Sequence, residues 1–289
     1  MPSRATRRAV FAGSWYAGSR ESLWHQIEEL FLGPHGPGRL PKLGERNDDL
    51  VGILSPHAGY LYSGQAAALA YYEVATNGPR DVVVLLGPNH RGVGSGIAIS
   101  PSDSWSTPLG EVEVDLEIAK EISKRSGIAD LDETAHRSEH SLEIQLPFLQ
   151  YVFKDNPFKI VPISVWMCDL RVAKELGSSM ADSLSGRNAL LVASSDMTHY
   201  MPAEVASERD KRTLEQIRAL DEEKTWKMAN EFESLCGLGP VLSCMVAAKK
   251  LGAEKGEVLG YYTSGDITGD NSAVVGYSAV AFKKGSVKR

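Results

Sequence analysis

The chain has 289 residues, of which 43% are hydrophobic and 24% are charged. These fractions exclude a collagen-like, coiled-coil or wholly disordered protein. A chain of this length buries about three quarters of its unfolded surface, so its core requires no disulfide or metal ion. Its 31 Lys and Arg residues against 37 Asp and Glu residues give a net charge of −6, which leaves no basic field for nucleic acid.

The three cysteines are Cys168, Cys236 and Cys244. An odd number cannot all pair within the chain, and no spacing matches a CxxC motif. We therefore expect a reducing, cytoplasmic compartment, in which each cysteine is a small core residue or a reactive or ligating thiol. No apolar stretch is long enough for a signal peptide or a membrane span. The basic residues from Lys283 to Arg289 are expected to form a solvated terminus.

Predicted strands and helices alternate along the chain, with apolar residues at helical spacing in the helices and β-branched runs in the strands. In the first half of the chain, we predict a helix over 19–31, a loop over 33–42, a strand over 50–54, a helix over 65–72 and a strand over 82–86. Short strands over 96–100 and 111–114 around a loop over 101–110 come next, then a helix over 116–124 and a helix over 141–153 that Pro147 kinks or begins. The remaining elements are a strand over 160–165, a helix over 171–184, a strand over 189–193, helices over 204–220, 223–232 and 240–251, and strands over 258–263 and 273–282. No repeat or linker separates two cores. We therefore expect one α/β domain over residues 1–289, with an ordered core of about residues 8–283. Its central sheet is expected to be mostly parallel and flanked by helices, with an antiparallel excursion near 96–114.

Polar side chains follow three of the predicted strands at the point where each strand ends. His57 follows the strand over 50–54, His90 the strand over 82–86, and Asp196 and His199 the strand over 189–193. Ligands bind outside the carboxyl ends of parallel strands, so these side chains are expected at one edge of the sheet. A proline shortly before each of the two histidines fixes the backbone there, which favours a site over an ordinary loop.

Asp196 and His199 are three residues apart, so they would face the same side on a first helical turn. An equal alternative is that Asp196 caps a helix over 197–203. The same carboxylate can cap this helix and also orient an imidazole. Ser194 and Ser195 lie nearby, but no order of base and acid supports a serine nucleophile. The motifs GxGxxG, GxxxxGK[ST], GxSxG and HExxH are absent, which removes the main support for dinucleotide binding, P-loop hydrolysis and the common serine hydrolases.

A second cluster spans residues 136–143, where two His and two Glu fall close together. His140 and Glu143 are predicted to share a helix face, with Ser138 or Ser141 as the cap. The ordinary interpretation is a solvated helix start, and the alternative is acid–base or supporting groups beside a site.

Histidines close to a carboxylate or thiol are typical ligands of transition metals. Two neutral imidazoles need an anionic third donor, for which the sequence offers Asp196, Glu143 or a cysteine. Cys236 precedes a predicted helix, whose dipole favours a thiolate. Cys244 is expected to be an inert core residue, and Cys168 stays open between these roles.

Taken together, seven motifs resemble those of the Memo family, which shares its fold with the class III extradiol (LigB-like) dioxygenases. They are Ala12–Tyr16, Ser55–Tyr60, Gly87–His90, Glu139–Glu143, Ser194–His199, Cys236–Pro240 and Gly269–Tyr277. Because they extend over nearly the whole chain in order, the resemblance is specific.

The resemblance implies a single α/β domain of the LigB-like type whose cleft holds a metal ion through His57, His90 and Cys236. It implies iron or copper and a redox role, with Asp196 and His199 lining the same cleft. Prokaryotic relatives are associated with a radical-SAM protein and an AMMECR1-like protein, and vertebrate relatives with phosphotyrosine peptides. No membrane partner is implied.

Two departures from the family patterns limit what can be transferred. After Cys236 and Gly237, the residues Leu238 and Gly239 stand where the vertebrate pattern has a basic residue and a histidine, which weakens a peptide-binding role. The extradiol enzymes use a glutamate as third donor. A thiolate favours softer ions such as Cu(I) or zinc and is itself oxidisable, so ring cleavage does not follow from the fold.

Three hypotheses follow. The first is a metal-dependent oxidoreductase that uses iron or copper, in which Asp196, His199 and His140 support the ligands or donate protons. The alternative is a non-catalytic module that binds a peptide or small ligand in the same cleft. A weaker alternative is a zinc-dependent hydrolase. Because ligation requires neutral imidazoles and a thiolate, metal affinity is predicted to fall below about pH 6.

Overall fold

The structure is a computed structural model that describes residues 5–285. Its strands are β1 (Thr6–Arg7), β2 (Leu50–Ser55), β3 (Val82–Pro88), β4 (Ile97–Ile99), β5 (Ser104–Thr107), β6 (Gly110–Val114), β7 (Asp130–Leu131), β8 (Lys159–Val165), β9 (Ala189–Ser194), β10 (His199–Met201), β11 (Ala253–Thr263) and β12 (Val274–Lys284). Its helices are α1 (Arg20–Leu32), α2 (Tyr60–Thr76), α3 (Leu116–Ser126), the short 3-10 helix η1 (Glu143–Gln145), α4 (Leu146–Phe153), α5 (Leu170–Leu184), α6 (Ala203–Arg218), α7 (Glu222–Phe232), α8 (Leu238–Lys250) and α9 (Ser264–Thr268).

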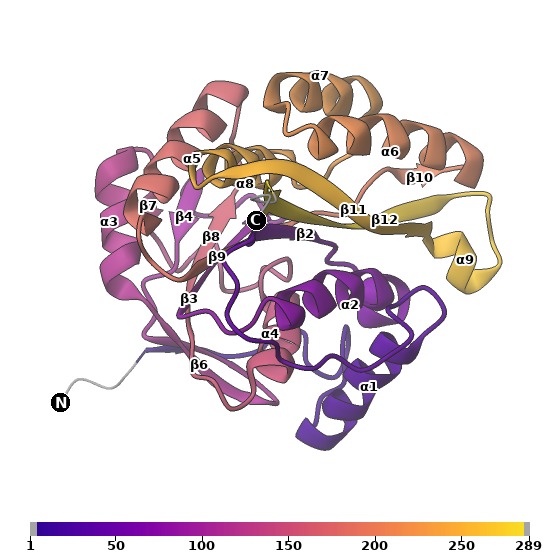
Figure 1. The fold of residues 1–289 in the computed structure, drawn as a ribbon, viewed down its shortest axis with the longest axis horizontal. Helices are drawn as coiled ribbons and strands as arrows, with labels where there is room; N and C mark the ends of the chain where they lie inside the picture. The colour runs from indigo at the N-terminus through magenta and orange to yellow at the C-terminus, as the bar shows by residue number, and fades with distance from the viewer. Residues whose placement is uncertain (1–4, 286–289) are drawn as a thin grey trace.

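One sheet runs through the molecule in the order β1-β5-β6-β8-β3-β9-β2-β12-β10, with β11 added beside β12, β4 beside β8, and β7 beside β4 (Figure 1). Five neighbouring strands of this sheet, β6, β8, β3, β9 and β2, are parallel to one another. Strand β12 pairs antiparallel with β2, β10 and β11, and β4 and β5 are the antiparallel excursion. The predicted α/β fold with a mostly parallel central sheet flanked by helices is therefore confirmed.

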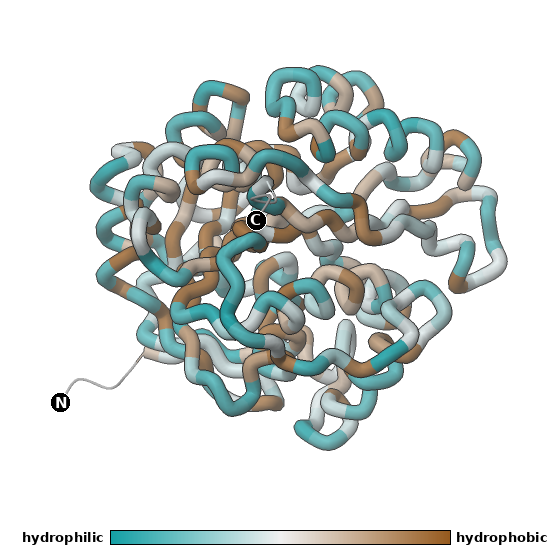
Figure 2. Tube along the Cα trace, viewed as in Figure 1, coloured by the Kyte–Doolittle hydropathy of each residue, from teal (hydrophilic) through white to brown (hydrophobic). Residues whose placement is uncertain are grey.

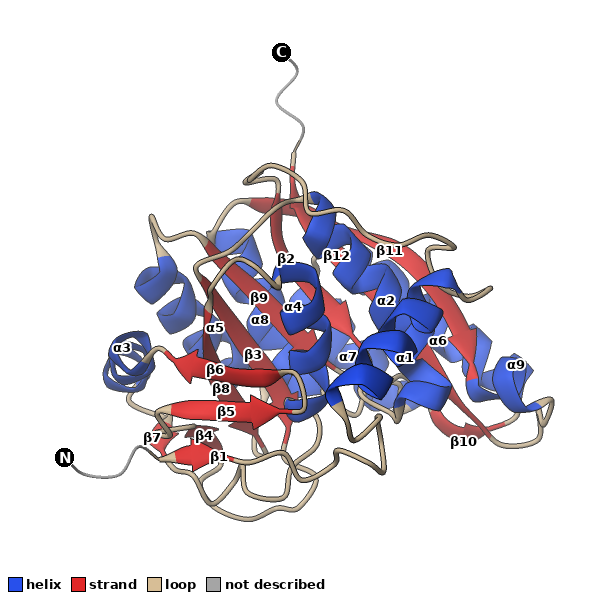
Figure 3. Ribbon diagram, turned by 90° about the horizontal axis from the view of Figure 1, so that it is seen from below, coloured by secondary structure: helices blue, strands red, loops and turns tan. Residues whose placement is uncertain are grey.

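The alternation of side chains along the central strands builds a core on each face of the sheet. In β3, Val82, Val84 and Leu86 pack in the core that includes α3, α5 and α8, whereas Val83 and Leu85 pack in the core that includes α1, α2 and α4. Figure 3 shows α1, α2 and α4 in front of the sheet and α5 and α8 behind it. Hydrophobic segments follow the central strands, and hydrophilic ones follow the outer helices and loops (Figure 2).

Four helices begin at side-chain caps, whereas the two that border the site are among those that do not. Ser19 caps α1, and Asp115, Asp169 and Asp221 cap α3, α5 and α7. By contrast, α2 begins at Gly59 and α8 at Gly237 without a side-chain cap. A Cβ atom at Gly237 would collide with the backbone oxygen of Ser194. Glycine therefore allows the start of α8 to lie directly against the end of β9.

Two local predictions were confirmed with other bounds. The helix predicted over 65–72 lies within the longer α2, and the helix predicted over 141–153 truly begins near Pro147, which stands in the first turn of α4, where a missing N–H costs nothing. Two others were wrong. The loop predicted over 101–110 contains β5. No helix forms over 197–203, because the amide of Met197 donates to Gly276 of β12 and residues 199–201 form β10.

The C-terminal basic residues that the structure describes, Lys283 and Lys284, are only partly solvated. Lys283 lies in β12, and its ammonium group forms ion pairs with Glu73 at 2.7 Å and Glu257 at 2.9 Å. Lys288 and Arg289 lie outside the described residues. Within residues 5–285, no helix is long and apolar enough to cross a membrane.

Candidate metal centre

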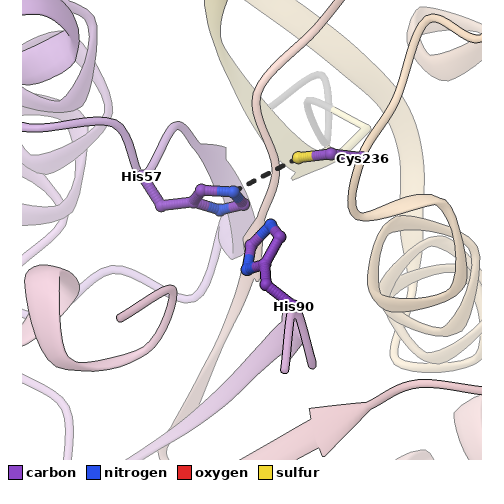
Figure 4. A group of neighbouring side chains, drawn as sticks. All are labelled: His57, His90 and Cys236. Carbon is purple, nitrogen blue, oxygen red and sulfur yellow. Dashed lines mark hydrogen bonds between the residues drawn. The ribbon is translucent and has the colours of Figure 1, made fainter. Parts of the chain in front are cut away.

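The carboxyl ends of β2 and β3 and the start of α8 bring three predicted site residues together. His57 lies just after β2, His90 just after β3, and Cys236 just before the first residue of α8. One ligand atom from each of the three lies within 4.8 Å of the others. Figure 4 shows the side chains pointing toward one another, and Sγ of Cys236 lies 3.2 Å from Nε2 of His57.

The hydrogen bonds of Ser194 determine which nitrogen of His57 carries a proton. The Ser194 hydroxyl donates to the carbonyl oxygen of Ser141 at 2.7 Å and accepts from the amide of Gln145 at 3.0 Å. Its single proton is thus used, so it accepts from Nδ1 of His57 at 2.8 Å. Nε2 of His57 is left with a lone pair facing Cys236. Burial, together with the nearby His90, holds the pKa of His57 well below its usual value, so the ring is neutral.

His90 is held by the buried carboxylate of Glu139. Nδ1 of His90 donates to Oε1 at 2.9 Å, and the backbone amide of His90 donates to Oε2 at 2.7 Å. The backbone amides of His140 and Ser141 also donate to Oε1, each at 2.9 Å. Burial alone would raise the pKa of Glu139, but these hydrogen bonds and the neighbouring histidines bring it to about 2. The carboxylate is therefore ionised, and Nε2 of His90 is the ring nitrogen that remains free.

Asp196 forms hydrogen bonds with both His57 and Cys236. Its Oδ1 accepts from the backbone amides of His57 at 2.7 Å and Ala58 at 3.3 Å. Burial raises the pKa of Asp196, against the effect of these hydrogen bonds. The backbone amide of Asp196 donates to the sulfur of Cys236 at 3.3 Å. Burial and the Asp196 charge raise the pKa of the Cys236 thiol, so they outweigh the helix dipole that was predicted to favour a thiolate.

His140 lies beside the two candidate ligand histidines, His57 and His90. It does not lie on a helix, although the sequence predicted one there. Its ring stacks on His90 with 4.5 Å between centroids and lies 4.2 Å from the ring of Trp15. Burial, together with the nearby His57, lowers the pKa of His140 to about 3. The predicted cap by Ser138 or Ser141 is also wrong, because neither η1 nor α4 has a side-chain cap, and the Ser141 hydroxyl donates to the carbonyl oxygen of Pro88 at 2.9 Å.

His136 and Glu143 of the 136–143 cluster are buried rather than solvated, since the N-terminal segment covers them, whereas Arg137 and Ser138 are exposed. Arg7 pairs with Glu143 at 2.7 Å, and both side chains are almost fully buried. The carboxylate of Glu143 also accepts from the backbone amides of Val10 and Phe11 and from the Tyr16 hydroxyl. These donors occupy Glu143, so it is no third donor beside the two histidines.

His199 is fixed by a strand rather than by the predicted helix. Its Nδ1 lies 2.8 Å from the carbonyl oxygen of Met197, which leaves Nε2 free. The preceding Thr198 donates through its amide and its hydroxyl to the buried Asp210. His199 is near enough to influence the pKa of Asp196.

The other two cysteines lie outside the three-residue group. Cys244 is buried in the core around α8, as predicted. Cys168, which the sequence left open, packs partly buried against the same core, and burial raises its pKa to about 12. His90, Glu139 and His140 form a second group with ligand atoms within 4.8 Å. Its carboxylate is already occupied by N–H donors, which makes it a poor ligand.

The sequence missed the contribution of two polar residues to this site. Gln145 donates to Ser194 and to the carbonyl oxygen of Pro56 while it accepts from the Tyr71 hydroxyl. The only feature of the sequence that pointed to Gln145 was its position as a polar residue within an apolar helical pattern. Ser194 was considered only as a nucleophile, although it orients His57.

The sequence profile of the Memo-like protein family matches residues 7–281. The chain belongs to the Memo-like family. A MEMO1 family protein of Methanopyrus kandleri is 43% identical over 282 residues, which cover 96% of this chain and 99% of the relative. A MEMO1 family protein of Methanothermobacter thermautotrophicus is 43% identical over 275 residues, which cover 94% of this chain and 98% of the relative.

Among solved structures, the uncharacterized protein JW3007 of Escherichia coli K12 is similar in fold, with a TM-score of 0.55 and 13% sequence identity. The match covers 81% of this chain and 99% of that one. At this identity the similarity concerns the fold alone, and it agrees with the LigB-like fold expected for a Memo-like chain.

Proposed function

We propose that this protein binds one iron or copper ion through His57, His90 and Cys236 and uses it in a redox or oxygen-handling reaction. The observation that supports the proposal is the convergence of their three ligand atoms within 4.8 Å. Imidazole nitrogen and thiolate sulfur are donors that first-row transition metals prefer. Both imidazoles already have Nδ1 engaged, by Ser194 and by Glu139, which leaves Nε2 for a metal.

The charges around the three ligands also fit a bound cation. Asp196 and Glu139 are 4% and 1% exposed. Within residues 5–285, their ion-pair partners are histidines, and neither carboxylate is paired with a lysine or arginine. The N–H groups that Glu139 accepts compensate for its burial, whereas burial raises the pKa of Asp196 despite its hydrogen bonds. A buried carboxylate without a strong cation is costly, and a divalent ion next to Asp196 would offset that cost.

A bound iron or copper ion would supply one-electron exchange and a Lewis-acidic position. The chain would supply orientation and proton handling. Ser194 and Glu139 would hold the two ligand imidazoles in one tautomer. His199 would hold or release a proton at Nε2, with Asp196 as its acidic neighbour. His140 would act as a neutral imidazole near pH 7, because its pKa is about 3.

The test is metal analysis of protein purified under reducing conditions, together with oxygen uptake. We expect near-unit iron or copper, lost in Cys236→Ala and in His57→Ala. Cys244→Ala is the matched control, since this cysteine is buried in the core away from the ligands. Equal trace metal in all four proteins would overturn the proposal. Zinc at unit stoichiometry without oxygen uptake would overturn the redox part and favour the hydrolase.

A second candidate function is ligand binding without catalysis, favoured by exposed apolar side chains that lie near the site histidines in the sequence. Such side chains closely follow the site histidines in the sequence, namely Leu61, Tyr62, Val93 and Tyr200. Exposed apolar patches mark ligand or partner surfaces. Saturable binding of a peptide library by chelator-treated protein, unchanged in Cys236→Ala, would favour this function. The radical-SAM and AMMECR1-like partners stay predictions from the resemblance.

A further inference from the structure

One carboxylate holds both the backbone and the ring of His90. Oε2 of Glu139 accepts the backbone N–H of His90 at 2.7 Å, and Oε1 accepts the ring N–H at 2.9 Å. The backbone N–H and the ring N–H of His90 are thus each held by one oxygen of Glu139. This constrains both the χ1 and the χ2 angle of His90. Glu139 itself is 1% exposed, so water does not compete for these hydrogen bonds.

The carboxylate is in turn fixed by its own segment. Oε1 of Glu139 also accepts the backbone amides of His140 and Ser141 at 2.9 Å each. The Ser141 hydroxyl then joins this segment to the end of β3 through the carbonyl oxygen of Pro88. Glu139 therefore cannot turn away from His90 without breaking several hydrogen bonds at once.

The two candidate ligand histidines differ in the group that holds Nδ1. His57 donates to the hydroxyl of Ser194, whereas His90 donates to a carboxylate that accepts four N–H groups in all. Hydrogen bonds to a charged acceptor are roughly twice as strong as those between neutral groups. A carboxylate on the far nitrogen also makes an imidazole a stronger donor at the near nitrogen.

We infer that Glu139 is a positioning residue of the metal centre, which locks His90 in the Nδ1–H tautomer and turns its Nε2 toward the metal. The inference rests on the proposed metal-binding function and assigns a role to a residue that would act on the metal only through His90. Direct ligation through Oε1 of Glu139 would require this oxygen to give up N–H groups that it accepts.

The test compares Glu139→Gln with Glu143→Gln in two measurements. The control removes a buried carboxylate four residues along the same segment, where the partners are Arg7 and the N-terminal segment rather than a site histidine. The first measurement is a long-range proton–nitrogen NMR spectrum of chelator-treated, ¹⁵N-histidine-labelled protein, which reports the tautomer of each ring. A His90→Gln sample assigns the His90 signals. The second is titration with Co²⁺ alone.

We expect His90 to be in the Nδ1–H form in the wild type and in Glu143→Gln, and to shift toward the other tautomer in Glu139→Gln. The Co²⁺ dissociation constant should rise about 10- to 100-fold in Glu139→Gln. It should stay unchanged in Glu143→Gln. A His90 that keeps the Nδ1–H form in Glu139→Gln would overturn the inference, as would an unchanged Co²⁺ affinity.

If Glu139→Gln does not fold, the wild-type spectrum alone decides, because a His90 in the Nε2–H form contradicts the inference. A wild-type protein that binds no Co²⁺ would instead count against the proposed function. The tautomer spectra would then still report whether Glu139 controls the ring of His90, so the two failures are distinguishable.

Discussion

The thiol of Cys236 lies 3.2 Å from Nε2 of His57, although 179 residues separate the two in the sequence. Burial keeps both groups neutral, since it lowers the pKa of the imidazole and, with the Asp196 charge, raises the pKa of the thiol. The pair is therefore a thiol that donates to an imidazole. Any cation that binds between them must displace the thiol proton.

Metal affinity should therefore rise with pH across the neutral range, because the thiol, and not the imidazole, limits ligation. The decline expected from the sequence below about pH 6 assumed histidines with an ordinary pKa. We expect about one proton to be released for each Co²⁺ bound at neutral pH. Calorimetric titration in buffers of different ionisation enthalpy measures this number. Cys236→Ala should release none, and equal proton release by both proteins would contradict the prediction.

The buried His136 should make the fold less stable in acid. Burial, together with the charge of Arg7, lowers its pKa to about 3 in the folded protein. The unfolded chain takes up this proton near pH 6.5, so between about pH 6.5 and pH 3 the unfolded state binds more protons. As the pH is lowered through this range, this group should reduce the free energy of unfolding by about 1.4 kcal/mol for each pH unit. Its stabilising effect is complete above pH 6.5 and lost as the pH approaches 3.

Urea denaturation of chelator-treated protein at several pH values measures this dependence. His136→Asn should reduce the slope by one proton, whatever it does to the stability itself. His25→Asn is the control, since the His25 side chain is 68% exposed. Equal slopes in the wild type and His136→Asn would contradict the assignment.

The buried pair of Arg7 and Glu143 should be important for stability. Arg7→Ala leaves a buried carboxylate without its cation, which typically costs about 3–5 kcal/mol. The exposed pair of Arg125 and Glu121 is the comparison, and Arg125→Ala should cost less than about 1 kcal/mol. Chemical denaturation gives both values. Similar values for the two variants would mean that the N-terminal segment is not held by Arg7.

Gly237 should not tolerate a side chain. An added Cβ would meet the backbone oxygen of Ser194, which cannot move without shifting β9. Gly237→Ala should therefore displace Cys236, weaken Co²⁺ binding and destabilise the fold by about 1–3 kcal/mol. Gly59→Ala is the matched control beside His57, because its Cβ would lie 3.5 Å from the nearest atom. A Gly237→Ala protein that binds Co²⁺ like the wild type would show that the contact of α8 with β9 is not needed.

The sequence predicted the parts of the site that depend on strand ends. Apolar runs ending in Pro56-His57 and Pro88-Asn89-His90 are local patterns, and parallel pairing aligns their carboxyl ends by rule. The choice of Cys236 needed the resemblance as well, because its distance from the strands in sequence carries no spacing signal.

The predictions that failed depended on partners far along the chain. Residues 136–143 were predicted to be solvated because they carry many charged side chains. In the structure, Arg7, more than 130 residues away in the sequence, pairs with Glu143. The helix predicted after Asp196 is prevented by β12, which takes the amide of Met197 into the sheet. Local propensity cannot report such pairings.

The candidate ligands belong to two layers of the fold, since His57 and His90 follow strands of the sheet and Cys236 lies two residues before the first residue of α8 in the helix layer. An ion held by all three would act as a cross-link that closes a loop from residue 57 to residue 236. Cross-links of this kind restrict the unfolded chain more strongly as the enclosed loop grows longer. In a protein whose three cysteines are all free, the metal would thus do for the whole domain what a long-range disulfide does elsewhere.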